Sequence, residues 1–161
     1  MAAPTNTQKI YQRVTGFQLD SPMVVPGRLK YTAAAVTIVK GDAIHDDGSG
    51  LATNATTDLS ALFLGIAAAD CASGGDCYVI PADSKCTYWV LNGAAAAQAA
   101  QTDIGEYCDL KTCNTVDVSD TAGANGWGFR VYEIDISDQA LANDGKSAIL
   151  GGFVKGKFER T

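Results

Sequence analysis

The sequence has few of the residues on which acid–base and metal chemistry usually depend. It contains one histidine, His45, among its 161 residues, so a Ser-His-Asp triad would have to use that residue. His45 precedes the stretch Asp-Asp-Gly-Ser-Gly at residues 46–50, whose composition is typical of a polar turn. We therefore expect a solvent-exposed turn histidine and not a catalytic base.

Short spacings between cysteines are also missing. The five cysteines, at positions 71, 77, 86, 108 and 113, contain no C-x2-C pair, and paired ligands at short spacing are the usual mark of a zinc site. We expect buried small side chains, with one or two local disulfides under oxidising conditions. Cys71 and Cys77 flank a turn that could bring them together, and the odd count leaves at least one thiol free.

Motifs that bind phosphates or metals are missing as well. No GxGxxG follows a predicted strand, no GxxxxGK[ST] is present, and the GANGWG stretch at residues 123–128 is interpreted as a turn. Counted from Asp42, the EF-hand positions 3 and 6 hold Ile44 and Asp47, which does not match that loop, although a looser calcium site stays open. No pair among the 18 acids is singled out for glycoside hydrolysis. We expect no cofactor, no bound metal and no enzymatic activity.

Long hydrophobic runs and a surplus of bases are absent. No run of 18 apolar residues is present, and residues 1–17 lack the apolar core of a secretion signal, so we expect no membrane span and synthesis in a cytoplasm. The net charge of −6 argues against nucleic-acid binding, which needs a basic surface. Residues 1–40 carry five bases and one acid, residues 41–145 three bases and sixteen acids, and residues 146–161 four bases and one acid. Such asymmetry reports on partners more than on fold.

Proline is rare, and three of the four prolines lie in the first 31 residues. This segment shows no sustained period of 2 or 3.6, but it contains more large apolar residues than a disordered tail would. We predict an extended N-terminal arm over residues 1–31 and a β-rich body domain over residues 32–161. We expect the body to stay folded when the arm is removed.

The chain does contain a series of short β-branched and aromatic runs separated by turn residues. The predicted strands cover residues 35–39, 43–45, 62–67, 77–80, 86–91, 107–110, 115–118, 127–136 and 149–158. In the 127–136 strand, Tyr132 and Ile134 are predicted to face one side and Glu133 the other. The alanine-rich stretch 94–101 is the single predicted helix. The pattern predicts a mainly β fold: a small β-barrel or β-sandwich (β-tulip-like) with one short helix.

Several segments resemble small β-rich virion proteins of tailed bacteriophages. They are VKGDA at residues 39–43, the 46–50 turn, TNAT at 53–56, FLGIAAAD at 63–70, DIGEYCDL at 103–110 and the 127–136 strand. A strand, a Gly-Asp turn, an FLGIA-like strand and an alanine-rich segment follow one another as in the capsid decoration, or cement, proteins. The resemblance covers residues 35–153.

The resemblance implies a non-enzymatic structural protein on the outside of an expanded icosahedral capsid. Proteins of this family bind the major capsid protein, often as trimers near three-fold positions, and stabilise the shell against packaged DNA. The implied location is therefore the capsid exterior of the virion. The N-terminal arm is expected to grip capsid subunits or neighbouring copies.

The residues themselves fit this role. An extended arm can add a strand to the edge of a partner's sheet, and its bases can pair with an acidic surface. The predicted partner-binding residues are the bases and aromatic residues of the arm: Lys9, Tyr11, Arg13, Phe17, Arg28, Lys30 and Tyr31. A homotrimer would also cover exposed strand edges, and many copies on a lattice gain avidity.

Two other classes stay open at this point. One is a different virion part, such as a head-completion, tail or fibre-associated β-protein. The other is a small β-barrel enzyme or carbohydrate-binding module, for which exposed rings at Tyr88 or Trp89 would be the first indication. Aromatic residues on strands are, however, more often core or interface residues.

Overall fold

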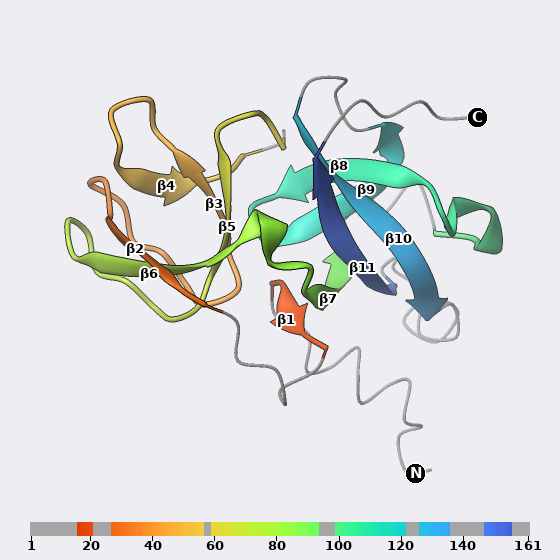
Figure 1. Ribbon diagram of the computed structural model, residues 1–161. Coiled ribbons are helices and arrows are strands. Elements are labelled where there is room, and N and C mark those ends of the chain that lie inside the picture. The colour runs from red at the N-terminus through yellow and green to blue at the C-terminus, as the bar shows by residue number, and fades with distance from the viewer. Residues whose placement is uncertain are drawn as a thin grey trace, which may run out of the picture.

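The described part of the chain is built almost entirely from short β-strands (Figure 1). The computed structural model describes residues 16–20, 27–56, 59–93, 99–121, 126–135 and 147–155. The strands are β1 (Gln18–Leu19), β2 (Leu29–Thr32), β3 (Ala43–Asp46), β4 (Ala52–Asn54), β5 (Phe63–Ala67), β6 (Asp76–Pro81), β7 (Thr87–Asn92), β8 (Tyr107–Thr112), β9 (Thr115–Thr121), β10 (Trp127–Asp135) and β11 (Ala148–Lys155). Two single-turn 3₁₀ helices, η1 (Ala82–Ser84) and η2 (Gln101–Asp103), lie between strands. The predicted mainly β fold is confirmed, and within these ranges no helix has the length and hydrophobicity needed to cross a bilayer.

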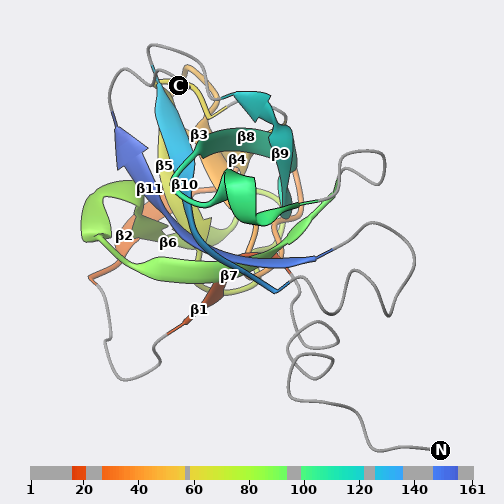
Figure 2. The ribbon, with the colours of Figure 1, turned by 90° about the vertical axis from the view of Figure 1, so that its right-hand side faces the viewer.

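Six strands form a sheet that closes on itself. Its order is β1-β7-β11-β10-β8-β9, and β9 also pairs with β7, so that β7, β11, β10, β8 and β9 form a ring (Figures 1 and 2). The closing contact is short and parallel, with Leu91 of β7 opposite Thr115 of β9. β1 pairs with the first half of β7, beside this closing contact. Closure pairs the strand edges that an open sheet would expose.

Apolar side chains from every strand of the ring fill the inside of this barrel. β7 buries every second residue, which is the alternation expected of a strand with one face on a core. The fully buried members of the barrel interior include Val90, Leu110, Val116, Phe129 and Ile149. The barrel is therefore a packed core and not a channel.

The second sheet has five strands in the order β2-β6-β5-β3-β4. Alternate residues of its central strands point into two different cores, because successive side chains of a strand face opposite sides. Ile66 and Ile80 belong to the main core, which is shared with the barrel, whereas Ala67 and Val79 belong to a smaller second core. The other buried members of the second core are Ala33, Ile38, Ile44, Ala52, Cys71 and Cys77.

The barrel and the second sheet are joined by the main core and by hydrogen bonds. Phe63 of β5 packs against Trp127 and Phe153 of the barrel, with ring centroids 6.0 and 4.7 Å apart. The Trp127 N–H donates to the Leu59 carbonyl at 2.8 Å. The Leu59 N–H in turn donates to the buried carboxylate of Asp109 at 2.6 Å. These contacts fix the position of the second sheet against the barrel.

The strand predicted over residues 35–39 is wrong. Ile38 makes an isolated bridge to Cys71, and its fully buried side chain lies in the second core, whereas the neighbouring Val39 is 55% exposed. The β-branched residues of this segment therefore lie in a loop that covers the second core. Of the predicted helix at 94–101, residues 94–98 lie outside the described residues, and the rest is not α-helical: Ala100 is extended and Gln101 begins η2.

The alternation predicted for the 127–136 strand is also wrong at one position. A β-bulge lies between Val131 and Glu133 of β10, so Tyr132 has no opposite residue on β11. The extra residue reverses the sides that follow it. Tyr132 is 44% exposed as a result, whereas Ile134 is buried.

The predicted boundary between an arm and a body at residue 31 falls inside β2. β1 belongs to the barrel sheet and β2 belongs to the second sheet. β1 lies wholly within the predicted arm, and β2 lies within it except for its last residue, Thr32. Residues 16–20 and 27–31 are therefore integral parts of the β-structure. The predicted domain division does not describe them.

Candidate partner-binding surface

A short strand ties the N-terminal segment to the barrel. In β1, Gln18 lies opposite Trp89 and Leu19 lies opposite Tyr88. Two further hydrogen bonds flank this pairing: the Phe17 N–H donates to the Gly41 carbonyl at 2.8 Å, and the Asp20 N–H donates to the Thr87 carbonyl at 3.0 Å. Residues 16–20 thus connect to both sheets, since Gly41 precedes β3 and Thr87 begins β7.

The backbone turns sharply where this segment begins. Gly16 has a φ of +68°, a left-handed conformation that side-chain-bearing residues rarely adopt. A Cβ at this position would lie 2.7 Å from the Gly41 carbonyl oxygen. The glycine therefore permits the close approach that allows the next residue to enter the core.

Phe17 is a core residue, which corrects its prediction as a partner-binding residue. Its side chain is 3% exposed, and its ring lies 5.3 Å from that of Phe153, 5.6 Å from that of Phe129 and 6.2 Å from that of Tyr88. A ring enclosed in this way has no surface left for a partner. Its role is to anchor the segment that continues toward the N-terminus.

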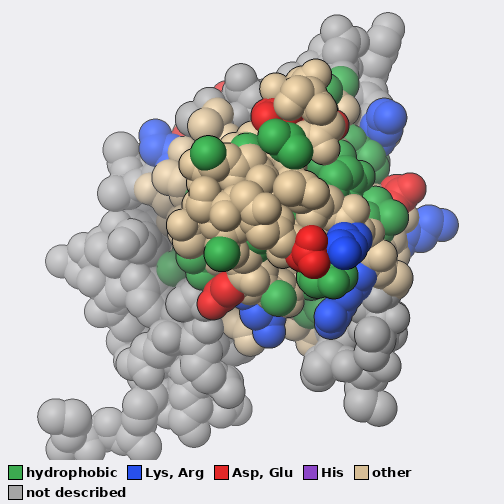
Figure 3. Space-filling model, turned by 90° about the vertical axis from the view of Figure 1, so that its left-hand side faces the viewer, with side chains coloured by type: hydrophobic (Ala, Val, Ile, Leu, Met, Phe, Trp, Pro, Cys, Tyr) green, Lys and Arg blue, Asp and Glu red, His purple; other side chains and the backbone are tan. Residues whose placement is uncertain are grey.

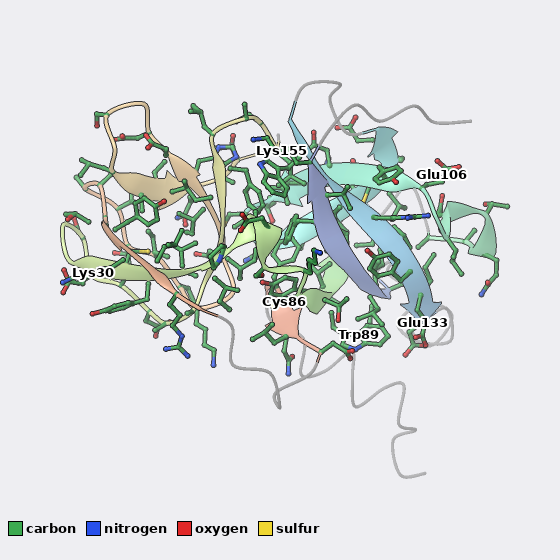
Figure 4. The ribbon with its side chains drawn as sticks, in the orientation of Figure 1. Lys30, Cys86, Trp89, Glu106, Glu133 and Lys155 are labelled. Atoms are coloured by element: carbon green, nitrogen blue, oxygen red, sulfur yellow. The ribbon has the colours of Figure 1, made fainter. Side chains whose placement is uncertain are left out.

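The aromatic pair on β7 is held by the same segment. Tyr88 is 1% exposed, and burial raises the pKa of its phenol above the ordinary value of 10. Trp89 is partly buried and its indole N–H donates to the Asp20 carboxylate at 2.9 Å, next to β1 (Figure 4). Tyr88 therefore cannot contribute to an exposed sugar-stacking platform.

The edge strand β2 carries the other described residues of the predicted set. Arg28 and Lys30 are exposed, and the Lys30 ammonium lies 3.3 Å from the Asp76 carboxylate, with both side chains about 60% exposed. Tyr31 is partly buried and packs against the second core. An exposed ion pair of this kind contributes little to stability. Lys9, Tyr11 and Arg13 lie outside the described residues.

One exposed aromatic side chain lies beside these bases, and the sequence prediction missed it. Tyr78 is 41% exposed and lies opposite Lys30, whereas Leu29, which is 44% exposed, lies opposite Val79 and therefore points to the other face of the sheet. We call the set Arg28, Lys30 and Tyr78 the β2 edge. Figure 3, which views the molecule from the side of the second sheet, shows several Lys and Arg side chains toward one side of this face, with hydrophobic and acidic side chains among them. The alternation in the β6 sequence DCYVIP was the available signal, because it places Tyr78 on the face opposite the buried Cys77 and Val79.

The single histidine is not in a turn. His45 lies in β3, is partly buried, and packs edge-on against Phe63 with ring centroids 6.1 Å apart. In the loop that follows, Asp46 accepts the N–H groups of Gly48 and Gly50, at 2.7 and 3.0 Å. Asp47 accepts the Ser49 hydroxyl, and that hydrogen bond lowers the pKa of its carboxyl. The carboxylates of this loop therefore organise its own backbone.

Asp42 is a buried carboxylate at the junction of the two sheets. It accepts the Val39 N–H at 3.0 Å and the thiol of Cys113 in the β8–β9 turn, while the Cys113 carbonyl accepts the Ala43 N–H at 2.6 Å. Burial raises the pKa of Asp42, and the nearby Asp70 carboxylate adds to the rise. Burial likewise raises the pKa of Cys113 to about 11. A thiol held in its protonated form is a structural donor and not a nucleophile.

No group of three or more His, Cys, Asp and Glu side chains arranged to hold a metal ion occurs among the residues that the structure describes. Comparison of the whole chain with models of protein families and with curated proteins returned no match. We call residues 16–20 the β1 anchor. The β1 anchor and the β2 edge are the features from which a function is inferred.

Proposed function

We propose that this protein binds the outer surface of a tailed-bacteriophage capsid and stabilises the shell as a non-enzymatic decoration protein. The observation that carries the proposal is the β1 anchor. It joins residues 1–15, which contain Lys9, Tyr11 and Arg13, to a packed barrel at one defined point. A segment fixed at one end to a rigid body loses less conformational freedom when it binds than a free peptide does.

The β2 edge offers a second contact of suitable chemistry. Arg28 and Lys30 are exposed cations, and Tyr78 provides apolar area beside Lys30. A patch of this composition suits an acidic protein surface with apolar positions, where aromatic residues and arginine contribute most of the binding energy. The major capsid protein is the partner proposed for it.

A homotrimer is part of this proposal. The Lys30 and Glu106 side chains lie at opposite ends of the molecule (Figure 4). A contact between these unlike ends of neighbouring copies is heterologous, and a heterologous contact forms a ring such as a trimer when its rotation closes. A trimer that binds a repeating lattice at three points gains avidity without stronger individual contacts.

The test is co-sedimentation of the purified protein with expanded and unexpanded capsids assembled from the capsid protein encoded with it. We expect the full chain to sediment with expanded capsids only, and a variant that lacks residues 1–15 to lose most of this binding while its melting temperature is unchanged. A Lys9→Glu/Arg13→Glu variant should weaken binding at least ten-fold. The matched control is Lys111→Glu, which changes an exposed base of β8 that belongs neither to residues 1–15 nor to the β2 edge.

Several outcomes would contradict the proposal. Undiminished binding by the 1–15 deletion would show that the N-terminal segment does not grip the capsid. A monomeric molar mass in multi-angle light scattering would contradict the proposed trimer. Binding to tails or to the head–tail connection in electron micrographs of labelled protein, with bare capsid faces, would assign the protein to another part of the virion.

A further inference from the structure

Cys71 and Cys77 come together in the second core. Cys71 exchanges two backbone hydrogen bonds with Ile38, at 3.0 and 2.8 Å, and Cys77 lies in β6 opposite Tyr31. The two side chains are 4% and 0% exposed and belong to the same apolar cluster. The loop and the strand therefore direct both thiols into one enclosed space.

The Cys71 and Cys77 side chains lie close together in this core. Burial raises the pKa of Cys77 and Cys71 adds to the rise, while the Cys71 thiol donates to the Ala72 carbonyl at 3.4 Å. Both cysteines are free thiols in this structure. A disulfide needs its sulfur atoms about 2.05 Å apart, so the two side chains would have to approach each other to that distance.

The backbone around the pair is held in place. Within the five-residue turn between the cysteines, the Gly75 N–H donates to the Ala72 carbonyl at 2.9 Å. The same turn is tied to the end of β2, because the Ala33 N–H donates to the Gly75 carbonyl at 2.8 Å. A bond between the two sulfur atoms would therefore leave the backbone hydrogen bonds of this turn in place.

The other three cysteines have different neighbours. The Cys108 thiol lies in the barrel and donates to the Phe129 carbonyl at 3.5 Å. The Cys113 thiol donates to Asp42, and the Cys86 sulfur lies 4.0 Å from the Ser84 carbonyl oxygen. Cys71 and Cys77 are thus the two described cysteines whose side chains share one buried cluster with each other.

We propose that Cys71 and Cys77 form an intramolecular disulfide within the native fold when the protein meets a disulfide oxidant such as oxidised glutathione. The Cys71 thiolate attacks one sulfur of oxidised glutathione, forming a mixed disulfide and releasing one glutathione thiolate. Cys77 then attacks the Cys71 sulfur and releases the second. The two protons of the protein thiols end on the two glutathione molecules, so one disulfide is reduced as one is formed.

The environment of the pair sets the order and the rate of these steps. Burial is the main cause that raises the pKa of Cys77, to about 11, so little thiolate forms there at neutral pH. Cys71 is the more exposed of the two and is therefore the first to react. We expect slow oxidation that accelerates as the pH rises. The inference does not depend on the proposed binding to a capsid.

The test is incubation of the full, folded chain with oxidised glutathione, followed by thiol counting in denaturant and peptide mapping by mass spectrometry. We expect the count to fall from five to three, with a peptide pair linked through Cys71 and Cys77 and a mass two hydrogen atoms lower. Cys71→Ser and Cys77→Ser should form no internal bridge, whereas the matched variant Cys113→Ser should still form it. The oxidised protein should melt at a higher temperature than the reduced protein.

Three results would overturn the proposal. Five thiols after prolonged incubation would show that the native pair does not react. Glutathione left attached to Cys71 without resolution by Cys77, or a bridge that includes Cys86, Cys108 or Cys113, would show that the wrong pair was chosen. A bridge that forms only during refolding from denaturant would show that the folded state does not support it. The wild-type mapping decides among these results even if a serine variant fails to fold.

Discussion

Phe17 shows how the role of one side chain depends on the backbone next to it. Its place in a proline-marked segment without periodicity suggests an exposed residue, yet Gly16 turns the chain so that the ring enters the barrel. It completes a cluster of rings with Tyr88, Phe129 and Phe153. Edge-to-face and tilted packing of this kind adds to the free energy gained by burying the rings.

Replacing Phe17 by alanine should therefore destabilise the whole barrel. Truncation of a buried phenylalanine removes its transfer free energy and leaves a cavity, so we expect a loss of about 3–5 kcal/mol in the free energy of unfolding. Urea unfolding followed by tryptophan fluorescence measures this loss. The neighbouring Gln18 is exposed, and Gln18→Ala should change stability by less than about 0.5 kcal/mol. Equal effects of the two substitutions would show that Phe17 is not an anchor.

At the scale of elements, the pairing of β10 with β11 depends on two adjacent glycines. A Cβ at Gly151 would lie 2.6 Å from the Phe129 ring inside the barrel. A Cβ at Gly152 would lie 3.3 Å from the Tyr132 ring, which covers the outside of the strand. One aromatic ring thus packs over each face of β11, and the β10 bulge places the outer ring there.

Gly151→Ala should weaken this strand pair. The added methyl group would have to displace the Phe129 ring or the Arg130 carbonyl, and overpacking of this type costs about 1–3 kcal/mol. Thermal unfolding followed by circular dichroism should show a lower melting temperature. A Cβ added at Gly27 would meet no other atom within 4 Å, so Gly27→Ala is the matched control and should leave the melting temperature nearly unchanged.

The strand sequence alone predicted most of the described elements but not all of them. The aromatic and β-branched run of β7 and the β5 sequence FLGIA were predicted as strands, because period and composition act locally. Residues 35–39 have the same composition, yet the chain bends there, since Ile38 covers the second core instead of joining a sheet. The β10 bulge is a shift in the pairing of β10 with β11, which the alternation within the β10 sequence does not show.

The candidate surface was harder to predict than the fold. The exposure of Arg28 and Lys30 agrees with the expectation for charged residues, whereas the burial of Phe17 depends on barrel strands that begin some seventy residues later in the chain and end with β11. Lys30 and Tyr78 lie together only because β2 pairs with β6. Contacts between distant segments were therefore the part that local patterns could not supply.

At the scale of the whole molecule, Asp42 lies where the second sheet meets the β8–β9 turn of the barrel. Its carboxylate contacts the Val39 N–H and the Cys113 thiol, and it faces the Asp70 carboxylate. Because burial raises its pKa in the folded state, folding favours the protonated form of this group. Ionisation of Asp42 at neutral pH therefore lowers the free energy of unfolding.

Stability should depend on pH through this residue. A raised pKa gives a contribution that is fully present below the ordinary value of 3.8 and is lost as the pH rises through the folded-state pKa. Relative to Asp42→Asn, the wild-type protein should lose stability across that range, as measured by urea midpoints at a series of pH values. Parallel curves for the two proteins would show that Asp42 does not titrate differently on folding.

The three-way pairing of β7 has a consequence for the order in which the chain can fold during synthesis. β7 pairs with β1, which is made long before it, and with β9 and β11, which are made after it. Until residue 155 has left the ribosome, β7 lacks one neighbour and the barrel has an open seam through which its aromatic rings meet water. Nascent chains stalled before β11 should therefore be the species most easily captured by chaperones or cleaved by proteases, and release of the last strand should protect all earlier ones at once.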